Sequence, residues 1–228
     1  MKFNRSLLAH AVIASIAVTG LAIANQDGAD GSHGDHNDSS IGAPADVGAF
    51  KMILGDKKMN DPNAMAEWMA LGQPGEAHKF LAKFNGEWKT TMRIAIDPSQ
   101  PPTESFGRAW FEPVLGGRFI QHKLATPMMG MPYEGLGFLG FDNTTRMFTQ
   151  SWMNSMSTDV LMSKGSINRE GNQITMFGEM NEPGTGEVGK VVKFLYRFDN
   201  DDKFMFEVWE VMYGDPWKVF EIEYNRKK

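Results

Sequence analysis

The chain has 228 residues, enough for one domain with a sizeable core; 42% are hydrophobic, 22% are charged, and the formal net charge at pH 7 is −5. This composition excludes wholesale disorder, and the acidic balance argues against a nucleic-acid partner, which requires a basic surface. Cysteine is absent, which excludes disulfides, iron–sulfur clusters, thiol nucleophiles and cysteine-ligated zinc.

Residues 1–24 have the pattern of an export signal. Lys2 and Arg5 make the start positive, an apolar stretch follows over 7–24, and Ala22-Ile23-Ala24 matches the A-x-A form of a cleavage site. The alternative is an uncleaved anchor, because the stretch approaches the roughly 20 residues that span a bilayer. Small residues at its end favour cleavage. We therefore expect an exported protein, periplasmic or extracellular, that is not inserted in the membrane once the signal is removed.

Residues 25–48 are rich in Gly, Ser, Asp and Asn, with almost no side chain to bury, and are predicted to form a flexible acidic leader. The leader contains five aspartates and no Lys or Arg, so it carries most of the net acidity of the chain. His33 and His36 are ligand types for a divalent cation, but gathering ligands on a flexible segment costs conformational entropy. We predict a polar leader without a metal site.

Residues 49–85 are predicted to form a helical segment. Asp61-Pro62 is typical of a helix start, because Pro suits the first helical position, and Gly72 is typical of a helix end. A second short helix is expected over 76–84. His78 shares its apolar face, and we interpret this histidine as a packing residue.

From Gly86 onward the apolar period changes from helical to alternating, with turn residues between the alternating segments. Strands are expected over 87–97, 105–111, 118–126, 133–142, 146–154, 159–169, 172–181, 188–199, 203–213 and 218–226. Most connections are short enough for hairpins, so the strands run antiparallel in up-and-down order, and so long a meander closes to remove its edges. The predicted fold is mainly β: a closed antiparallel up-and-down barrel of about ten strands over 86–228, with one or two short N-terminal helices capping one end.

Gly86-Glu87-Trp88, placed after a short helix, resembles the G-x-W entry of calycin barrels, which include lipocalins, fatty-acid-binding proteins and nitrobindins. More specific similarity lies in Trp68-Met69, Pro74-Gly75-Glu76-Ala77-His78, Leu115-Gly116-Gly117-Arg118-Phe119, Met131-Pro132-Tyr133-Glu134-Gly135, Gly140-Phe141-Asp142 and Ile222-Glu223-Tyr224-Asn225-Arg226. Over roughly 64–228 the chain resembles the bacterial domain-of-unknown-function family fifteen seventy-nine. That resemblance implies a calycin-like barrel, often exported, and brings no catalytic residues with it.

A barrel whose interior is too wide for side chains to fill becomes a ligand cavity, so we expect one for a small apolar or amphipathic molecule. Nine of the 17 methionines lie between Met128 and Met180, and thioether chains suit an adaptable apolar wall. For any single Met, core packing is the simpler role. Strand alternation selects as candidate ligand-binding residues lining the cavity Arg108, Trp110, His122, Phe194, Tyr196, Glu210 and Tyr224.

Three of these candidates are polar residues on otherwise apolar rows: Arg108, His122 and Glu210. A buried charge without a partner costs several kcal/mol, so each must meet a counter-charge, water or a ligand. One interpretation is an internal ion pair between Arg108 and Glu210. The other is a polar anchor inside an apolar cavity, suited to a ligand carboxylate.

The function favoured is therefore an exported small-molecule-binding barrel. An interaction or structural module of the cell envelope is the alternative, favoured if Trp152, Trp209 and Trp217 face outward, because protein interfaces are rich in aromatic residues.

Catalysis in the cavity is a further alternative, with His122 and either Glu210 or Glu134 as acid–base partners. No nucleophile elbow, phosphate loop or metal-ligand spacing supports an enzyme. The nitrobindin resemblance would require an axial histidine for haem, and none follows His122, so no cofactor is expected. The methionines of 126–132 form a soft set suited to Cu(I), but an apolar loop over the barrel mouth is the simpler interpretation, and no metal is expected.

Overall fold

The computed structural model describes residues 63–95, 100–182, 186–212 and 214–228. The predicted export signal, the acidic leader and the predicted helix start at Asp61-Pro62 lie outside this part of the chain. Helix α3 (Ala64–Leu71) ends at Gly72, as predicted, and belongs to a separate unit from the barrel, which begins at Pro74. Within the described ranges, no helix combines the length and apolar character needed to cross a lipid bilayer.

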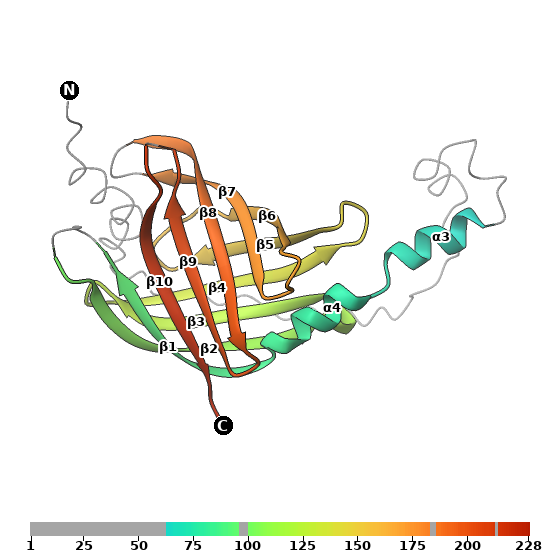
Figure 1. Ribbon diagram of the computed structural model, residues 1–228, viewed down its shortest axis with the longest axis horizontal. Helices are drawn as coiled ribbons and strands as arrows, with labels where there is room; N and C mark the ends of the chain where they lie inside the picture. The colour runs from blue at the N-terminus through green and yellow to red at the C-terminus, as the bar shows by residue number, and fades with distance from the viewer. Residues whose placement is uncertain (1–62, 96–99, 183–185, 213) are drawn as a thin grey trace, which may run out of the picture. The chain divides into compact units, whose positions relative to one another are not determined.

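Ten antiparallel strands form a closed barrel in which each strand pairs with its neighbours in sequence and β1 pairs with β10 (Figure 1). The strands are β1 (Gly86–Ile94), β2 (Thr103–Val114), β3 (Phe119–Met128), β4 (Met131–Asp142), β5 (Met147–Asn154), β6 (Leu161–Ile167), β7 (Gln173–Glu182), β8 (Glu187–Asn200), β9 (Lys203–Glu210) and β10 (Trp217–Arg226). The predicted up-and-down barrel is confirmed. Closure leaves none of these strands as an exposed edge.

One end of the barrel is closed by α4 (Glu76–Leu81) and the 3-10 helix η1 (Ala82–Phe84), which together occupy the second predicted helix. Leu81 and Phe84 are each 1% exposed and belong to the core. His78 is buried with its ring edge-on to Phe141, and its Nδ1 accepts a hydrogen bond from the backbone N–H of Gly75 at 3.0 Å. It is a packing residue, as predicted.

At the same end, the G-x-W segment meets the end of the last strand. The Trp88 Nε1–H donates to the carbonyl of Phe84 at 2.8 Å, and the Arg226 guanidinium lies 4.1 Å above the Trp88 ring. Arg226 also donates hydrogen bonds of 2.6 to 2.7 Å to three main-chain carbonyls, those of Lys83, Asn85 and Asp201. One side chain therefore holds η1, the turn between β8 and β9, and β10 together.

Strand β2 presents the opposite faces to those predicted. Ala109 and Phe111 are buried, whereas Arg108 is exposed and Trp110 is 39% exposed. The inward residues are small over much of the strand: a Cβ at Gly107 would lie 2.4 Å from a main-chain oxygen of β3. The prediction that Arg108 and Trp110 face the interior is wrong, because β2 approaches β3 closely at the inward Gly107 and leaves the larger Phe106 and Trp110 outside.

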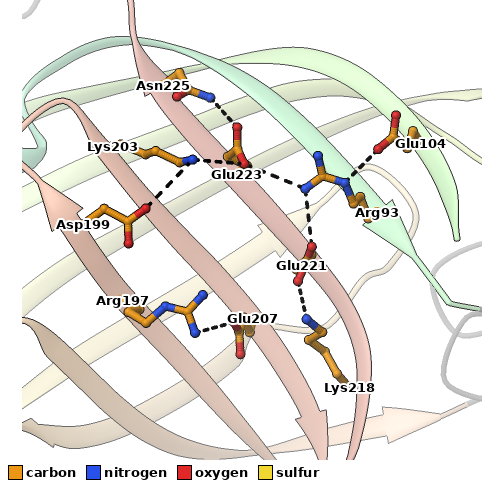
Figure 2. Close-up of polar contacts among 10 residues, drawn as sticks. All are labelled: Arg93, Glu104, Arg197, Asp199, Lys203, Glu207, Lys218, Glu221, Glu223 and Asn225. Atoms are coloured by element: carbon orange, nitrogen blue, oxygen red, sulfur yellow. Dashed lines mark hydrogen bonds and ion pairs between the residues drawn. The ribbon is translucent and has the colours of Figure 1, made fainter.

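Charged side chains join the outer faces of β1, β2 and β8 to β10 across the barrel seam (Figure 2). Arg93 of β1 lies 2.7 Å from Glu104, 3.3 Å from Glu221 and 3.9 Å from Glu223. The remaining contacts are Lys218 with Glu221, Lys203 with Asp199 and Glu223, Asn225 with Glu223, and Arg197 with Glu207. Through Arg93, these contacts link β1 to β10, the first and last strands of the barrel.

The network lowers the pKa of two glutamates. Partial burial acts to raise the pKa of Glu221, but hydrogen bonds and charge from Lys218 and Arg93 outweigh it and leave the pKa below its ordinary value. For Glu223, the hydrogen bond from Asn225 lowers the pKa most, with Lys203 and Arg93 adding to the effect. Both carboxylates are therefore held in their charged form.

Candidate functional site

A cavity of about 250 Å³ lies inside the barrel and is lined by every strand except β2. At roughly 30 Å³ per water molecule, it has the volume of about eight waters. Its apolar wall consists of Met92, Leu124, Met128, Met156, Leu161, Met180, Phe194, Phe206, Val208, Phe220 and Ile222. Four of these are methionines, the flexible side chains that best adapt to an occupant.

Three polar pairs face this cavity from the barrel interior. The Tyr196 hydroxyl donates to Gln150 Oε1 at 3.1 Å, and the Trp152 Nε1–H donates to the Tyr133 hydroxyl oxygen at 2.9 Å. The third pair is the Tyr224 hydroxyl and His122 Nε2, 3.5 Å apart. Hydrogen-bonding groups are therefore held at defined positions in an otherwise apolar space.

These groups are uncharged at neutral pH. His122 is 5% exposed and stacks on Phe111 with ring centroids 4.0 Å apart, and burial lowers its pKa to about 3. Burial raises the pKa of Tyr133 to about 12, against the opposing hydrogen bond from Trp152. Burial likewise raises the pKa values of Tyr196 and Tyr224.

The cavity reaches solvent beside the connection between β5 and β6 and the end of β7. Thr158, Asp159 and Asn181 line it there and are exposed. Asn154 Oδ1 accepts from the backbone N–H of Met156 at 2.8 Å, which holds the connection in place. Within the described part of the chain, Asp159 is the only Asp, Glu, Lys or Arg of the lining, and it lies at the mouth.

Four of the seven predicted residues line this cavity: His122, Phe194, Tyr196 and Tyr224. Arg108 and Trp110 are on the outer face of β2 and do not reach it. Glu210 is buried but lies outside the cavity lining, and it forms an ion pair with Lys190, whose side chain is 3% exposed.

The first interpretation of the polar candidates, an ion pair between Arg108 and Glu210, is therefore wrong. Lys190 supplies the counter-charge instead, because β8 and β9 are neighbours and place both side chains at the same end of the barrel, where Glu210 faces Val192 across the sheet. The second interpretation, a polar anchor for a ligand carboxylate, loses its cation as well, because the Arg108 guanidinium lies on the outer face of β2.

The acid–base pairing suggested by the sequence is not formed. Glu134 is exposed on the outside of β4, and Glu210 is paired with Lys190, so the polar neighbour of His122 is the Tyr224 hydroxyl. Neither Glu134 nor Glu210 lies beside this imidazole.

The tryptophans and loop methionines also occupy varied positions. Trp152 lines the cavity and Trp217 packs against the core, whereas Trp209 lies on the outer surface with Lys193 over its ring at 4.6 Å.

In the turn between β3 and β4, Met128 is buried while Met129 and Met131 are 42% and 37% exposed, so the three thioethers do not share one site. Across the described ranges, no group of three or more His, Cys, Asp or Glu side chains is placed to hold a metal ion.

Sequence reasoning missed Tyr133, Gln150 and Trp152 as cavity residues. A signal for Gln150 was present, because it alternates with Phe148 and Trp152 along β5 and so shares their inward face. A polar residue in such an apolar row marks a position where an interior needs a hydrogen bond.

The profile of the family described as protein of unknown function (DUF1579) matches residues 73–226. Among solved structures, the chain is similar to the crystal structure of Rv2717c from M. tuberculosis, with a TM-score of 0.52 and 17% sequence identity over 68% of this chain and 100% of that one. At this identity the likeness shows a shared barrel fold and nothing about function. No curated protein matches the sequence.

Proposed function

The chain belongs to the family described as protein of unknown function (DUF1579), and we propose that its barrel binds a small amphipathic molecule. The observation that supports this function is the 250 Å³ cavity, since protein interiors contain few voids larger than a water molecule. An apolar wall with a few placed polar groups is the usual character of a small-molecule site.

The arrangement of the lining supports an amphipathic occupant. The methionine and phenylalanine wall gains from covering an apolar body, while Gln150 and Tyr133 offer hydrogen bonds to a polar end. The exposed residues at the mouth give such a molecule a way in.

Binding is tested first on the purified full chain by native mass spectrometry, and then by titration with naphthol, a small uncharged fluorophore. Leu161→Trp adds bulk at the cavity rim, and Val160→Trp adds the same bulk next to it, at a residue 53% exposed and outside the lining. We expect Leu161→Trp to weaken naphthol binding by about tenfold or more and Val160→Trp to leave it unchanged. Absence of binding to the wild-type chain, or equal effects of the two variants, would contradict the proposal.

The proposal includes export, for which residues 1–24 are the support. Expression of the full chain in a bacterium should yield, in the periplasm or medium, a product whose measured mass lacks these residues. A full-length product retained in the cytoplasm would contradict export without affecting ligand binding.

A further inference from the structure

We propose that the polar end of the bound molecule is an uncharged carbonyl group, as in a ketone or ester, and that the site discriminates against carboxylates. This inference rests on the proposed function, because it concerns the ligand of the same cavity. Two observations support it: hydrogen-bond donors that lack acceptors, and the charge of the residues that line the cavity.

Gln150 supplies the first unmatched donor. Its side chain is 5% exposed and lines the cavity, and its Oε1 accepts the hydroxyl of Tyr196. The Nε2 amide group carries two N–H donors, and neither has a partner among the described residues. An occupant that covers this group without accepting from it would leave a buried donor unsatisfied, at a cost of about 1–3 kcal/mol, so the group favours an occupant that brings an acceptor.

Tyr133 supplies the second donor, from the neighbouring strand. Its hydroxyl oxygen accepts from Trp152 Nε1, which leaves the hydroxyl proton free to donate, and no acceptor for it lies in the part of the chain that the structure describes. The polar contact of His122 and Tyr224 is with each other, not with Tyr133 or Gln150. Two donors that line the cavity, the Gln150 amide and the Tyr133 hydroxyl, are therefore without acceptors among the described residues, and an acceptor oxygen on the ligand would satisfy one of them.

The charge of the lining decides between acceptors. Among the described residues, no Lys or Arg contributes to the lining, and Asp159 at the mouth has the wrong sign to attract a carboxylate. Lys190, a buried cation, is already paired with Glu210. A carboxylate would therefore lose its hydration without meeting a counter-charge, at a cost of several kcal/mol, whereas a ketone or ester oxygen has little hydration to lose.

The test compares three ligands with chains of equal length, methyl octyl ketone, decanoate and decane, as competitors of naphthol at neutral pH. We expect the ketone to bind about tenfold more tightly than decanoate and decane, since one good hydrogen bond is worth about that factor and one uncompensated charge is worth that factor or more. Infrared spectra of the bound ketone should show the carbonyl stretch shifted to lower wavenumber by hydrogen bonding.

Two variants test which residues are responsible. Gln150→Met removes both amide donors, and Gln121→Met makes the same change on the outer face of β3. Gln150→Met should remove most of the infrared shift and lower ketone affinity by about tenfold, while Gln121→Met changes neither. If Gln150→Met fails to fold, Tyr133→Phe, which removes a single hydroxyl, should weaken the ketone and leave decane unaffected.

Decanoate binding as tightly as the ketone, or a carbonyl stretch unshifted in the wild-type chain, would overturn the inference while naphthol binding keeps the proposed function intact. Failure of all three ligands to displace bound naphthol would overturn it too. Failure of naphthol itself to bind overturns the proposed function and this inference with it.

Discussion

At the scale of single residues, the burial of His122 makes the stability of the barrel depend on pH. Its pKa falls from the ordinary 6.5 to about 3 on folding, so below pH 6.5 the unfolded chain takes up a proton that the folded chain refuses. Above pH 6.5, His122 does not reduce the free energy of unfolding. As the pH falls from 6.5 toward 3, protonation of the unfolded chain lowers this free energy, with a limiting slope of about 1.4 kcal/mol per pH unit.

We therefore predict that His122→Gln flattens the dependence of unfolding free energy on pH between pH 6.5 and about 5, as measured by urea denaturation. Over this range Glu221 and Glu223 remain ionised in the folded chain, so they add little slope. His78, whose pKa burial also lowers, is unchanged in the variant and accounts for the slope that remains. An unaltered slope would refute the assignment to His122.

The candidate site was predictable only in part. His122 and Tyr224 each lie between two polar or charged outward neighbours, and Tyr196 lies beside Arg197, so alternation placed them. The partner of Glu210 could not be predicted, because its pairing with Lys190 depends on the register between β8 and β9. A sequence pattern indicates that a strand exists more reliably than it indicates where the strand begins and ends, so the register is not determined.

At the scale of elements, the ten strands were predictable because most carry bulk on the inner face and charge on the outer one. Strand β8, with Phe194 and Tyr196 against Lys193 and Arg197, is such a case. Strand β2 departs from the pattern over its first part, since Phe106 and Trp110 are outside while the small Ala109 lies within. Hydrophobic alternation reports the buried face only where that face also holds the larger side chains.

The outer-face network supports the seam between β1 and β10. Arg93→Met removes the cation that lies between carboxylates of β2 and β10, so we expect about 1 kcal/mol of destabilisation, reduced at high salt by screening. The pKa of Glu221, now below its ordinary 4.5, should rise. The stability that this carboxylate contributes is present above pH 4.5 and lost as the pH falls through its folded pKa, so the variant should lose less on acidification.

Urea denaturation at low and high salt measures the destabilisation and its screening. The same measurement repeated as the pH is lowered measures the loss of stability on acidification. Lys79→Met is the matched control, because Lys79 pairs with Glu76 on the solvent side of α4, outside the network. Equal destabilisation by the two changes, or a difference that is independent of salt, would show that the network adds nothing to the seam.

Arg226 holds three segments through a planar fork that lysine cannot reproduce. We expect Arg226→Lys to lower the unfolding free energy by about 2 kcal/mol, since it gives up hydrogen bonds to the carbonyls of Lys83, Asn85 and Asp201 as well as stacking over Trp88. Thermal unfolding measures the loss, and Lys227→Met, which removes one exposed ion pair with Glu87, should shift Tm far less. A variant as stable as the wild type would mean that solvent replaces these contacts without cost.

At the scale of the whole molecule, closure between β1 and β10 makes the barrel one cooperative unit. Removing residues 217–228 should leave β1 and β9 with unpaired edges, and the truncated chain should lose its cooperative urea transition and self-associate in size-exclusion chromatography. Removing 227–228 alone keeps β10 whole and is the control. A truncated chain that stays monomeric and unfolds in one sharp transition would contradict this account.

The same seam also sets the order in which the barrel can be completed during protein synthesis. The ribosome makes β1 before the other strands and β10 after them. Until β10 is made, β1 can pair only with β2, and its other edge stays unpaired. Throughout that time its free edge can pair with another nascent chain. Cellular yield of the protein therefore depends on how fast the last strand reaches the first, as well as on how stable the finished barrel is.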